Sequence, residues 1–341
     1  MPAEAHHPMT SPSPRLCLLN ILLSRRKDTI GEKSCIDVAG RGEEAVSETY
    51  GTAEWFEARF RLSDDDPWGN DWRGIEQYRH ERMARLMRRV VLGETRGNNE
   101  LKVLDIGCST GDFTKRLYEL NLNVTGIDIC QTAVDRAKAK FSYIDFRKDA
   151  FPKSCFRENT FDFITCPEVL YYMDKQTQKE VLIEIGHLLK NNGKALITSM
   201  IGEKPYFLPE ELLRLLSDHF QIEKIEYYGA RAYYRIEARF FQKLEQIEKV
   251  KRLFTLRPDE LRGELDRFKG RGKEVIEKII CAVVRFKCLQ LLAPIALRIL
   301  KGSIRSALRC YVGARVAHSI AEMLSLRRTH TFVLVGKKDG Q

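Results

Sequence analysis

The sequence lacks paired cysteines, clustered metal ligands and a long hydrophobic run. Its nine cysteines are scattered singly, and none forms a C-x-x-C pair. This pattern argues against a disulfide framework or a zinc site of the usual spacing, and it indicates a reducing compartment. The longest uncharged stretch near the C-terminus, residues 288–297, has ten residues and is too short to span a bilayer. We therefore expect no bound metal, and a cytoplasmic protein that can meet a membrane only peripherally.

Acidic residues are also scarce in one part of the chain. The 341 residues carry a net charge of +10, but residues 231–330 hold 23 Lys and Arg against ten Asp and Glu, and residues 281–320 hold seven basic residues and no acid. An apolar row and a basic row recur there on opposite faces of one predicted amphipathic helix: Leu300, Ile304, Ala307 and Tyr311 in the first, and Arg298, Lys301, Arg305 and Arg309 in the second.

Three interpretations of this basic segment stay open. It can be the solvated face of a helical cap. It can contact an anionic membrane through residues 281–320, with the basic residues on the headgroups. It can also contact nucleic acid or an acidic carrier, although the absence of an RNA-binding signature disfavours nucleic acid.

Apolar runs alternate with helical patterns through the middle of the chain. Strands are predicted near residues 101–106, 122–128, 143–147, 161–166, 193–200, 220–228 and 329–336. Helices are predicted near residues 52–62, 75–92, 112–120, 131–140, 176–190 and 209–218. This alternation predicts an α/β fold with a doubly wound, mostly parallel sheet.

The same patterns divide the chain into five parts. Residues 1–48 form a tail rich in Pro, Ser, Gly and charge, which we expect to be disordered. Residues 49–95 form a helical lid, and residues 96–229 form a Rossmann-like core. Residues 230–326 are a basic helical insert, and residues 327–341 supply the final strand and a tail.

One strand–loop–helix segment predicts a nucleotide-like ligand. Residues 101–111 end an apolar run in Asp105 and continue into a small-residue loop that contains Gly107 and Gly111. Such a layout lets backbone N–H groups approach a ligand. The next apolar run ends in Asp128, where an acid can accept both hydroxyl groups of a ribose. The two features together predict an adenosine pocket.

The spacing of the loop favours S-adenosyl-L-methionine over a dinucleotide. Ser109 stands where dinucleotide binders need a middle glycine, and Asp105 would face two phosphates. S-adenosyl-L-methionine has no phosphate, and its ammonium and sulfonium groups suit a nearby acid.

These residues resemble motif I of the class I S-adenosylmethionine-dependent methyltransferases. The resemblance covers roughly residues 50–229 and the last strand. It implies a seven-stranded sheet whose sixth and seventh strands, matched by residues 220–228 and 329–336, form an antiparallel pair. It also implies that Asp149 and Ala150 meet the adenine ring, and that the loop of Glu168 faces the methyl group. The cofactor-binding residues that we expect are Asp105, Gly107, Cys108, Ser109, Gly111, Asp128, Ile129, Asp149, Ala150, Glu168, Trp68 and Tyr78.

A narrower resemblance is to the nodulation protein S group, which includes N-methyltransferases of amino-sugar oligosaccharides. It rests on Glu54-Trp55-Phe56, Asp66-Pro67-Trp68-Gly69, Tyr78, the loop of residues 107–111 and Glu168-Val-Leu-Tyr-Tyr172. It implies methyl transfer to N or O of a small-molecule or sugar-like acceptor. A lipid or membrane-bound acceptor, and a non-catalytic module that binds a partner through the basic insert, stay open as alternatives. The insert itself is not part of the family pattern.

Four residues are candidates for the catalytic step. Glu168 would orient or deprotonate the acceptor, or would only cap the next turn. Tyr171 and Tyr172 would line the acceptor pocket, or would be half-buried aromatics. His80 would reach the site from the lid helix. Trp68, among the cofactor-binding candidates, would cover the sulfonium with its ring or would only anchor a turn.

Overall fold

The computed structural model describes residues 50–63, 66–91, 101–202, 205–240, 298–307, 309–324 and 328–338. The predicted tail of residues 1–48 and most of the predicted insert lie outside these ranges. Within them, no helix is both long and apolar enough to cross a bilayer.

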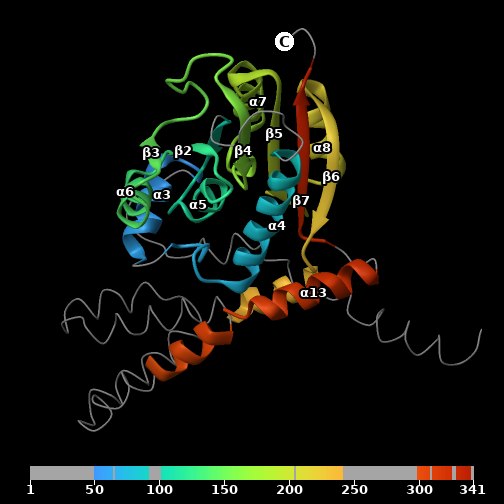
Figure 1. Cartoon of the computed structure of the whole chain (residues 1–341). Helices are drawn as coiled ribbons and strands as arrows, with labels where there is room; N and C mark the ends of the chain where they lie inside the picture. The colour runs from blue at the N-terminus through green and yellow to red at the C-terminus, as the bar shows by residue number, and fades with distance from the viewer. Residues whose placement is uncertain are drawn as a thin grey trace, which may run out of the picture. The chain divides into compact units, whose positions relative to one another are not determined.

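A seven-stranded sheet forms the centre of the protein (Figure 1). Its strands are β1 (Lys102–Ile106), β2 (Asn123–Asp128), β3 (Asp145–Lys148), β4 (Phe161–Pro167), β5 (Leu189–Met200), β6 (Phe220–Tyr228) and β7 (His330–Lys337). They lie in the order β3-β2-β1-β4-β5-β7-β6. Strands β1 to β5 pair in parallel, and β7 runs antiparallel to both of its neighbours. The predicted fold class is confirmed.

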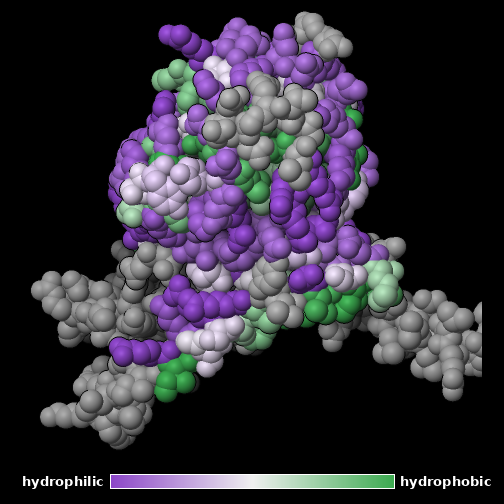
Figure 2. Space-filling model, in the orientation of Figure 1, coloured by the Kyte–Doolittle hydropathy of each residue, from purple (hydrophilic) through white to green (hydrophobic). Residues whose placement is uncertain are grey.

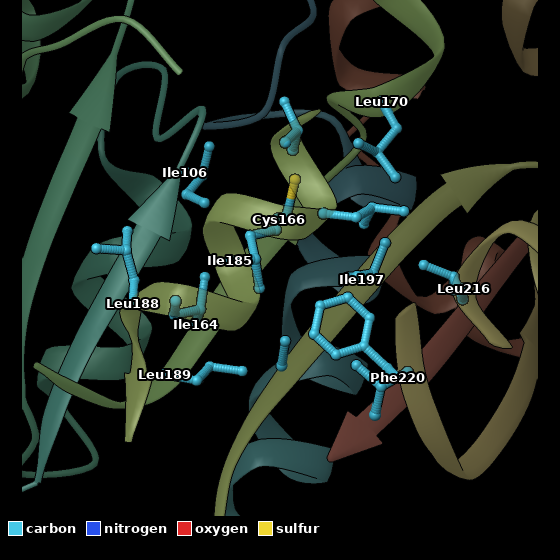
Figure 3. Close-up of a cluster of buried hydrophobic side chains, with 14 of the residues drawn as sticks. Ile106, Ile164, Cys166, Leu170, Ile185, Leu188, Leu189, Ile197, Leu216 and Phe220 are labelled. Atoms are coloured by element: carbon cyan, nitrogen blue, oxygen red, sulfur yellow. The ribbon is translucent and has the colours of Figure 1, made fainter. Parts of the chain in front are cut away.

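Helices cover both faces of the sheet. They are α3 (Ala53–Leu62), α4 (Gly74–Val91), α5 (Asp112–Tyr118), α6 (Gln131–Lys140), α7 (Lys175–Leu188), α8 (Pro209–His219) and α13 (Tyr311–Met323). One hydrophobic core lies between the sheet and α7 with α8, where Ile185 and Leu188 of α7 lie beside Ile164 and Ile197 of the sheet (Figure 3). A second core lies between the other face of the sheet and α4, α5 and α13. Burial on both faces explains why the inner strands β1, β4 and β7 are mostly apolar.

Two boundaries differ from the prediction. Helix α7 ends at Leu188 and β5 begins at Leu189, so the Asn-Asn-Gly segment of residues 191–193 lies inside the strand rather than between helix and strand. A positive φ of 66° at Asn192 accompanies this irregular start. The single amphipathic helix predicted through residue 311 is instead two helices, residues 298–307 and α13. Cys310 caps α13, its sulfur accepting a hydrogen bond from the N–H of Gly313 at 3.3 Å.

Helix α3 is attached to α6. The Thr132 hydroxyl donates to Glu57 Oε2 at 2.6 Å. Arg136 donates to the carbonyl oxygens of Phe60 and Ser63 at 2.9 and 2.8 Å. Because α6 follows β2, these bonds place the lid beside the carboxyl ends of the parallel strands.

Candidate functional site

The glycine loop after β1 is held against the end of β2. The N–H groups of Gly107 and Cys108 both donate to the Ile127 carbonyl, at 2.8 and 2.9 Å. Gly107 and Gly111 have φ values of 75° and 82°, which glycine adopts without steric cost. A Cβ at Gly107 would lie 2.4 Å from a methyl carbon of Val169. The loop therefore requires glycine for its conformation and for its packing.

Asp128 ends β2 directly beside this loop. One carboxylate oxygen accepts the N–H of Ser109 and the other accepts the N–H of Cys130, both at 2.9 Å. The side chain is half-buried. Burial raises the pKa of Asp128 to about 6, although the two N–H donors act in the opposite direction. Each carboxylate oxygen keeps a lone pair for a further donor.

Asp105 lies behind the loop and is fully buried. Its two carboxylate oxygens accept hydroxyl hydrogen bonds from Thr114 of α5 at 2.6 Å and from Thr165 of β4 at 2.7 Å. Burial raises the pKa of Asp105 to about 6. Its observed contacts therefore join β1 to the neighbouring helix and strand.

Asp149 follows β3 at the same edge of the sheet. Its N–H donates to the Asp128 carbonyl at 3.1 Å, and its carboxylate accepts the N–H groups of Ala150 at 2.9 Å and Cys155 at 3.3 Å. Ile129 directly follows Asp128 in the sequence and is half-buried. The fold thus brings the ends of β2 and β3, with Asp128, Ile129, Asp149 and Ala150, to one edge of the sheet; their part in an adenosine pocket stays a prediction.

Glu168 follows β4 and has a φ of 60°, which is uncommon for a residue with a side chain and is often found at functional sites. Its Oε1 accepts the Thr198 hydroxyl at 2.9 Å, and its Oε2 accepts the N–H of Met200 at 2.8 Å. Arg79 Nη1 of the lid helix α4 lies 3.7 Å from Oε1. The carboxylate is therefore fixed from β5 and from the lid.

Asp66 of the lid closes over the glycine loop, and its role is not singled out by the sequence analysis. Its Oδ2 accepts the hydroxyl groups of Ser109 at 2.8 Å and Thr110 at 3.2 Å, and its Oδ1 accepts the N–H of Trp68 at 2.7 Å. Asp66 is buried, and burial raises its pKa. Its position in the Asp-Pro-Trp-Gly segment, which is part of the family resemblance, is the sequence feature that could have predicted a role for Asp66 in the site.

Aromatic side chains of the lid and of the loop after β4 pack together. The Tyr172 ring lies 5.4 Å from Tyr50, 5.8 Å from Trp55 and 5.1 Å from Phe56. Tyr171 and Trp68 extend this group, Tyr171 toward Tyr206 at 5.2 Å and Trp68 toward Phe60 at 5.5 Å. Burial raises the pKa of Tyr172 to about 12 and that of Tyr171 well above its usual value. Both phenols therefore stay protonated and can donate hydrogen bonds.

Two predicted site residues, Tyr78 and His80, do not lie among the aromatic side chains described above. Tyr78 is buried in the core between α4, β6 and α13, with its ring 5.7 Å from those of Tyr228 and His318. His80 is buried with its ring 5.5 Å from Phe113. Burial and the neighbouring Arg79 hold the pKa of His80 well below its usual value. We therefore leave both residues outside the site that we propose.

A buried chain of charges joins the insert to the site. Arg73 donates from Nε and Nη2 to the two carboxylate oxygens of Glu237, which belongs to the helix of residues 231–240. Glu76 lies 3.7 Å from Arg73 and 2.8 Å from Arg79, which faces Glu168. The charges along this chain alternate in sign. The partners are up to 164 residues apart, so sequence spacing gives no signal for the chain.

The middle of the protein matches a known family. Residues 103–193 match the model of a family described as a methyltransferase domain. Nodulation protein S of Bradyrhizobium diazoefficiens is 32% identical over 115 residues, which cover 33% of this chain and 51% of the relative. Ubiquinone biosynthesis O-methyltransferase of Colwellia psychrerythraea is 28% identical over 132 residues, which cover 36% of this chain and 53% of that protein. The chain thus spans about half the length of these curated relatives.

A similar solved structure is that of the N-methyltransferase NodS from Bradyrhizobium japonicum in complex with S-adenosyl-L-homocysteine. It has a TM-score of 0.44 and 22% identity, and the match covers 52% of this chain and 90% of that chain. Residues 103–193 thus match a methyltransferase domain, the sheet has the strand order β3-β2-β1-β4-β5-β7-β6, and the chain is similar to the nodulation protein S group.

Proposed function

We propose that this protein is an S-adenosylmethionine-dependent methyltransferase that acts on N or O of a small or sugar-like acceptor. The observation that carries the proposal is the meeting of the glycine loop with Asp128 and Asp149 at the carboxyl edge of β1, β2 and β3. In open α/β sheets, ligands bind at this edge. The likeness to nodulation protein S and to an O-methyltransferase supports the reaction class and leaves the acceptor atom open.

The residues present fit this cofactor. A Cβ at Gly111 would lie 2.6 Å from the Phe146 ring, so only glycine allows the turn that carries the loop into α5. Three carboxyl groups lie beside the loop, those of Asp66, Asp105 and Asp128, and a fourth, Asp112, accepts from Thr110 and is paired with Lys140. They suit a donor with a positive sulfur and amino group, and they disfavour a pyrophosphate.

Each strand end has a separate part in this proposal. Asp128 accepts the ribose hydroxyl groups, and Asp149 with the N–H of Ala150 meets the adenine ring. The loop of Gly107, Cys108, Ser109 and Gly111 borders the amino-acid part of the cofactor, and Ile129 borders the adenine. Asp105 acts by joining β1 to α5 and β4 behind the loop, because it is fully buried and its two oxygens accept the threonine hydroxyls of those elements. Asp66 and Trp68 cover the site from the lid and exclude water.

When bound, the cofactor would supply a methyl group on a positive sulfur, which is a good leaving group. The protein then needs to orient the acceptor and to hold its proton. Glu168 is held by Thr198 and Met200 and can accept one further hydrogen bond from an acceptor N–H or O–H. Tyr171 and Tyr172 would line the acceptor side as protonated phenols.

A ligand-binding experiment and a turnover experiment together test the proposal. S-adenosyl-L-homocysteine at 100 times its dissociation constant should stabilise the fold by about 2.7 kcal/mol. That corresponds to a rise in melting temperature of about 5–10 °C for a domain of this size. Transfer of a labelled methyl group to a fraction of cell extract should follow. No thermal shift would refute the cofactor, and binding without any transfer would favour the non-catalytic alternative.

A further inference from the structure

Helix α13 buries one side against the core. Ala314, His318 and Ala321 are buried, and the His318 ring packs against Tyr78 and Tyr228. These three residues are spaced four and three apart, so they lie on one side of the helix. Among the described residues, α13 is therefore attached to the second core through this one side.

The opposite side of α13 is an exposed apolar stripe. Three of its side chains and the residue that caps it are between 43% and 75% exposed: Val316, Ile320 and Met323, with Leu324 as the cap. In the neighbouring helix of residues 298–307, Ile299 and Leu300 are 65% and 49% exposed. Figure 2 shows green apolar side chains along these two helices, beside hydrophilic ones. Exposed apolar side chains gathered on neighbouring helices of a folded protein indicate an interaction site.

Exposed cations lie next to this stripe. Arg298, Arg309 and Arg315 are exposed, and residues 281–320 contain no acid. Among residues 298–307 and 309–324, Glu322 is the acid, and it lies 3.3 Å from His318 Nε2. Apolar side chains flanked by arginines, with few acids, match the chemistry of an anionic lipid surface.

These two helices lie at the same edge of the sheet as the site. The N–H of Gly229, directly after β6, donates to His318 Nδ1 of α13 at 3.2 Å. His330 at the start of β7 pairs with Met200 at the end of β5, and the N–H of Met200 binds Glu168. Figure 1 shows α13 at this end of the strands. A partner surface that binds α13 would therefore lie near the carboxyl edge of the sheet.

We propose that the apolar stripe of α13, together with Ile299, Leu300 and the flanking arginines, docks on an anionic lipid bilayer. The four side chains of the stripe enter the interfacial region, and the arginines contact the headgroups. A nucleic acid would use the cations and leave the exposed Ile and Met side chains without a role. This docking goes beyond the proposed methyl transfer and does not depend on it.

Vesicle flotation of the full chain tests the docking surface. At low salt, the protein should float with vesicles of equal parts phosphatidylglycerol and phosphatidylcholine, and it should stay behind with phosphatidylcholine alone. The double variant Arg309→Gln/Arg315→Gln should lower the partition coefficient about 25-fold, at about fivefold for each cation. The variant Ile320→Gln/Met323→Gln should lower it about tenfold through lost apolar burial.

Matched controls use exposed residues elsewhere in the fold. Arg88→Gln on α4 removes an exposed cation, and Ile183→Gln on α7 removes an isoleucine that is 46% exposed. Both should float as the wild type does. Failure to float with anionic vesicles, or flotation of either α13 variant at the wild-type level, would overturn the proposal. Vesicle binding that depends on the arginines but not on Ile320 and Met323, and that duplex DNA displaces, would also overturn the proposal.

The thermal shift with S-adenosyl-L-homocysteine tests the proposed function separately from the docking surface. Each variant should keep the thermal shift that S-adenosyl-L-homocysteine produces, because none of the changed residues contacts the glycine loop. A variant that loses flotation but keeps the thermal shift supports the docking surface. A wild type that shows no thermal shift but floats refutes the proposed function and leaves the docking intact.

Discussion

Replacing Asp128 by Asn changes the charge at the centre of the proposed site and keeps its shape. In the wild type, the two carboxylate oxygens accept the N–H groups of Ser109 and Cys130. Asparagine offers one acceptor oxygen and one NH₂ group, so one backbone N–H would face a donor. The variant also loses the charged acceptor for a ribose hydroxyl.

Two expected effects of Asp128→Asn on binding can be given as magnitudes: the loss of affinity, and the loss of its pH dependence. A hydrogen bond to a charged group contributes about 1.5–3 kcal/mol, so S-adenosyl-L-homocysteine should bind about 10- to 150-fold more weakly. The pH dependence gives the second. Burial raises the pKa of Asp128 to about 6, so only about a tenth of the carboxyl groups are ionised at pH 5. Wild-type affinity should therefore fall about tenfold between pH 8 and pH 5, and the affinity of the variant should not follow this profile.

Titration calorimetry with S-adenosyl-L-homocysteine from pH 5 to pH 8 measures both effects. Asp135→Asn is the matched control, because Asp135 is an exposed carboxylate on α6, the helix that follows Asp128. The control should keep the wild-type affinity and pH profile. If Asp128→Asn binds within about twofold of the wild type and follows the same pH profile, the assignment of Asp128 to the cofactor is refuted.

Three further predictions concern the loop, the insert and the acceptor side. Gly111→Ala places a Cβ 2.6 Å from a carbon of the Phe146 ring at a residue with a φ of 82°, and it should lower the free energy of unfolding by denaturant by about 1–3 kcal/mol. In the control Gly302→Ala, the new Cβ has no atom within 4 Å, so this variant should be neutral or stabilising. Equal effects of the two substitutions would contradict the loop packing. Glu237→Gln removes the carboxylate that binds Arg73 through two hydrogen bonds and leaves Glu76, at 3.7 Å, as a remaining acid beside it, so the free energy of unfolding should fall by about 3 kcal/mol, the lower end for a broken buried pair. A loss below about 1 kcal/mol would contradict the burial of the pair. Glu168→Gln should lower the rate of methyl transfer about 100-fold with unchanged affinity for S-adenosyl-L-homocysteine, and an equal loss of affinity would point to a structural role.

Local patterns predicted the strands and most helices well. The predicted bounds of β1, β2, β4, β6 and β7 agree with the structure within about one residue. For β1, β4 and β7, which lie inside the sheet, burial on both faces explains the mostly apolar runs. The acids at strand ends were found for a related reason. Asp105 and Asp128 each interrupt such a run, and parallel strands bring their carboxyl ends to one edge.

Features that depend on distant partners could not be predicted. Tyr78 has the periodicity of a lid residue, but its neighbours Tyr228 and His318 are far away in the sequence, so spacing could not show that it belongs to the core. The helix of residues 298–307 and α13 were read as one, because the apolar period continues across residues 308–310. The structure shows the break at Cys310, which caps the new helix α13.

The place of β7 in the sheet has a consequence for how the protein is made. Residues 330–337 form a strand that lies between β5 and β6, so they occupy an interior position rather than an edge. On the ribosome, β6 therefore emerges about a hundred residues before the strand that joins it to the rest of the sheet. Until then the nascent chain exposes the β5 edge, which is a site for wrong pairing. A premature stop anywhere in the preceding hundred codons would leave a sheet without its sixth-position strand, and such products should be insoluble.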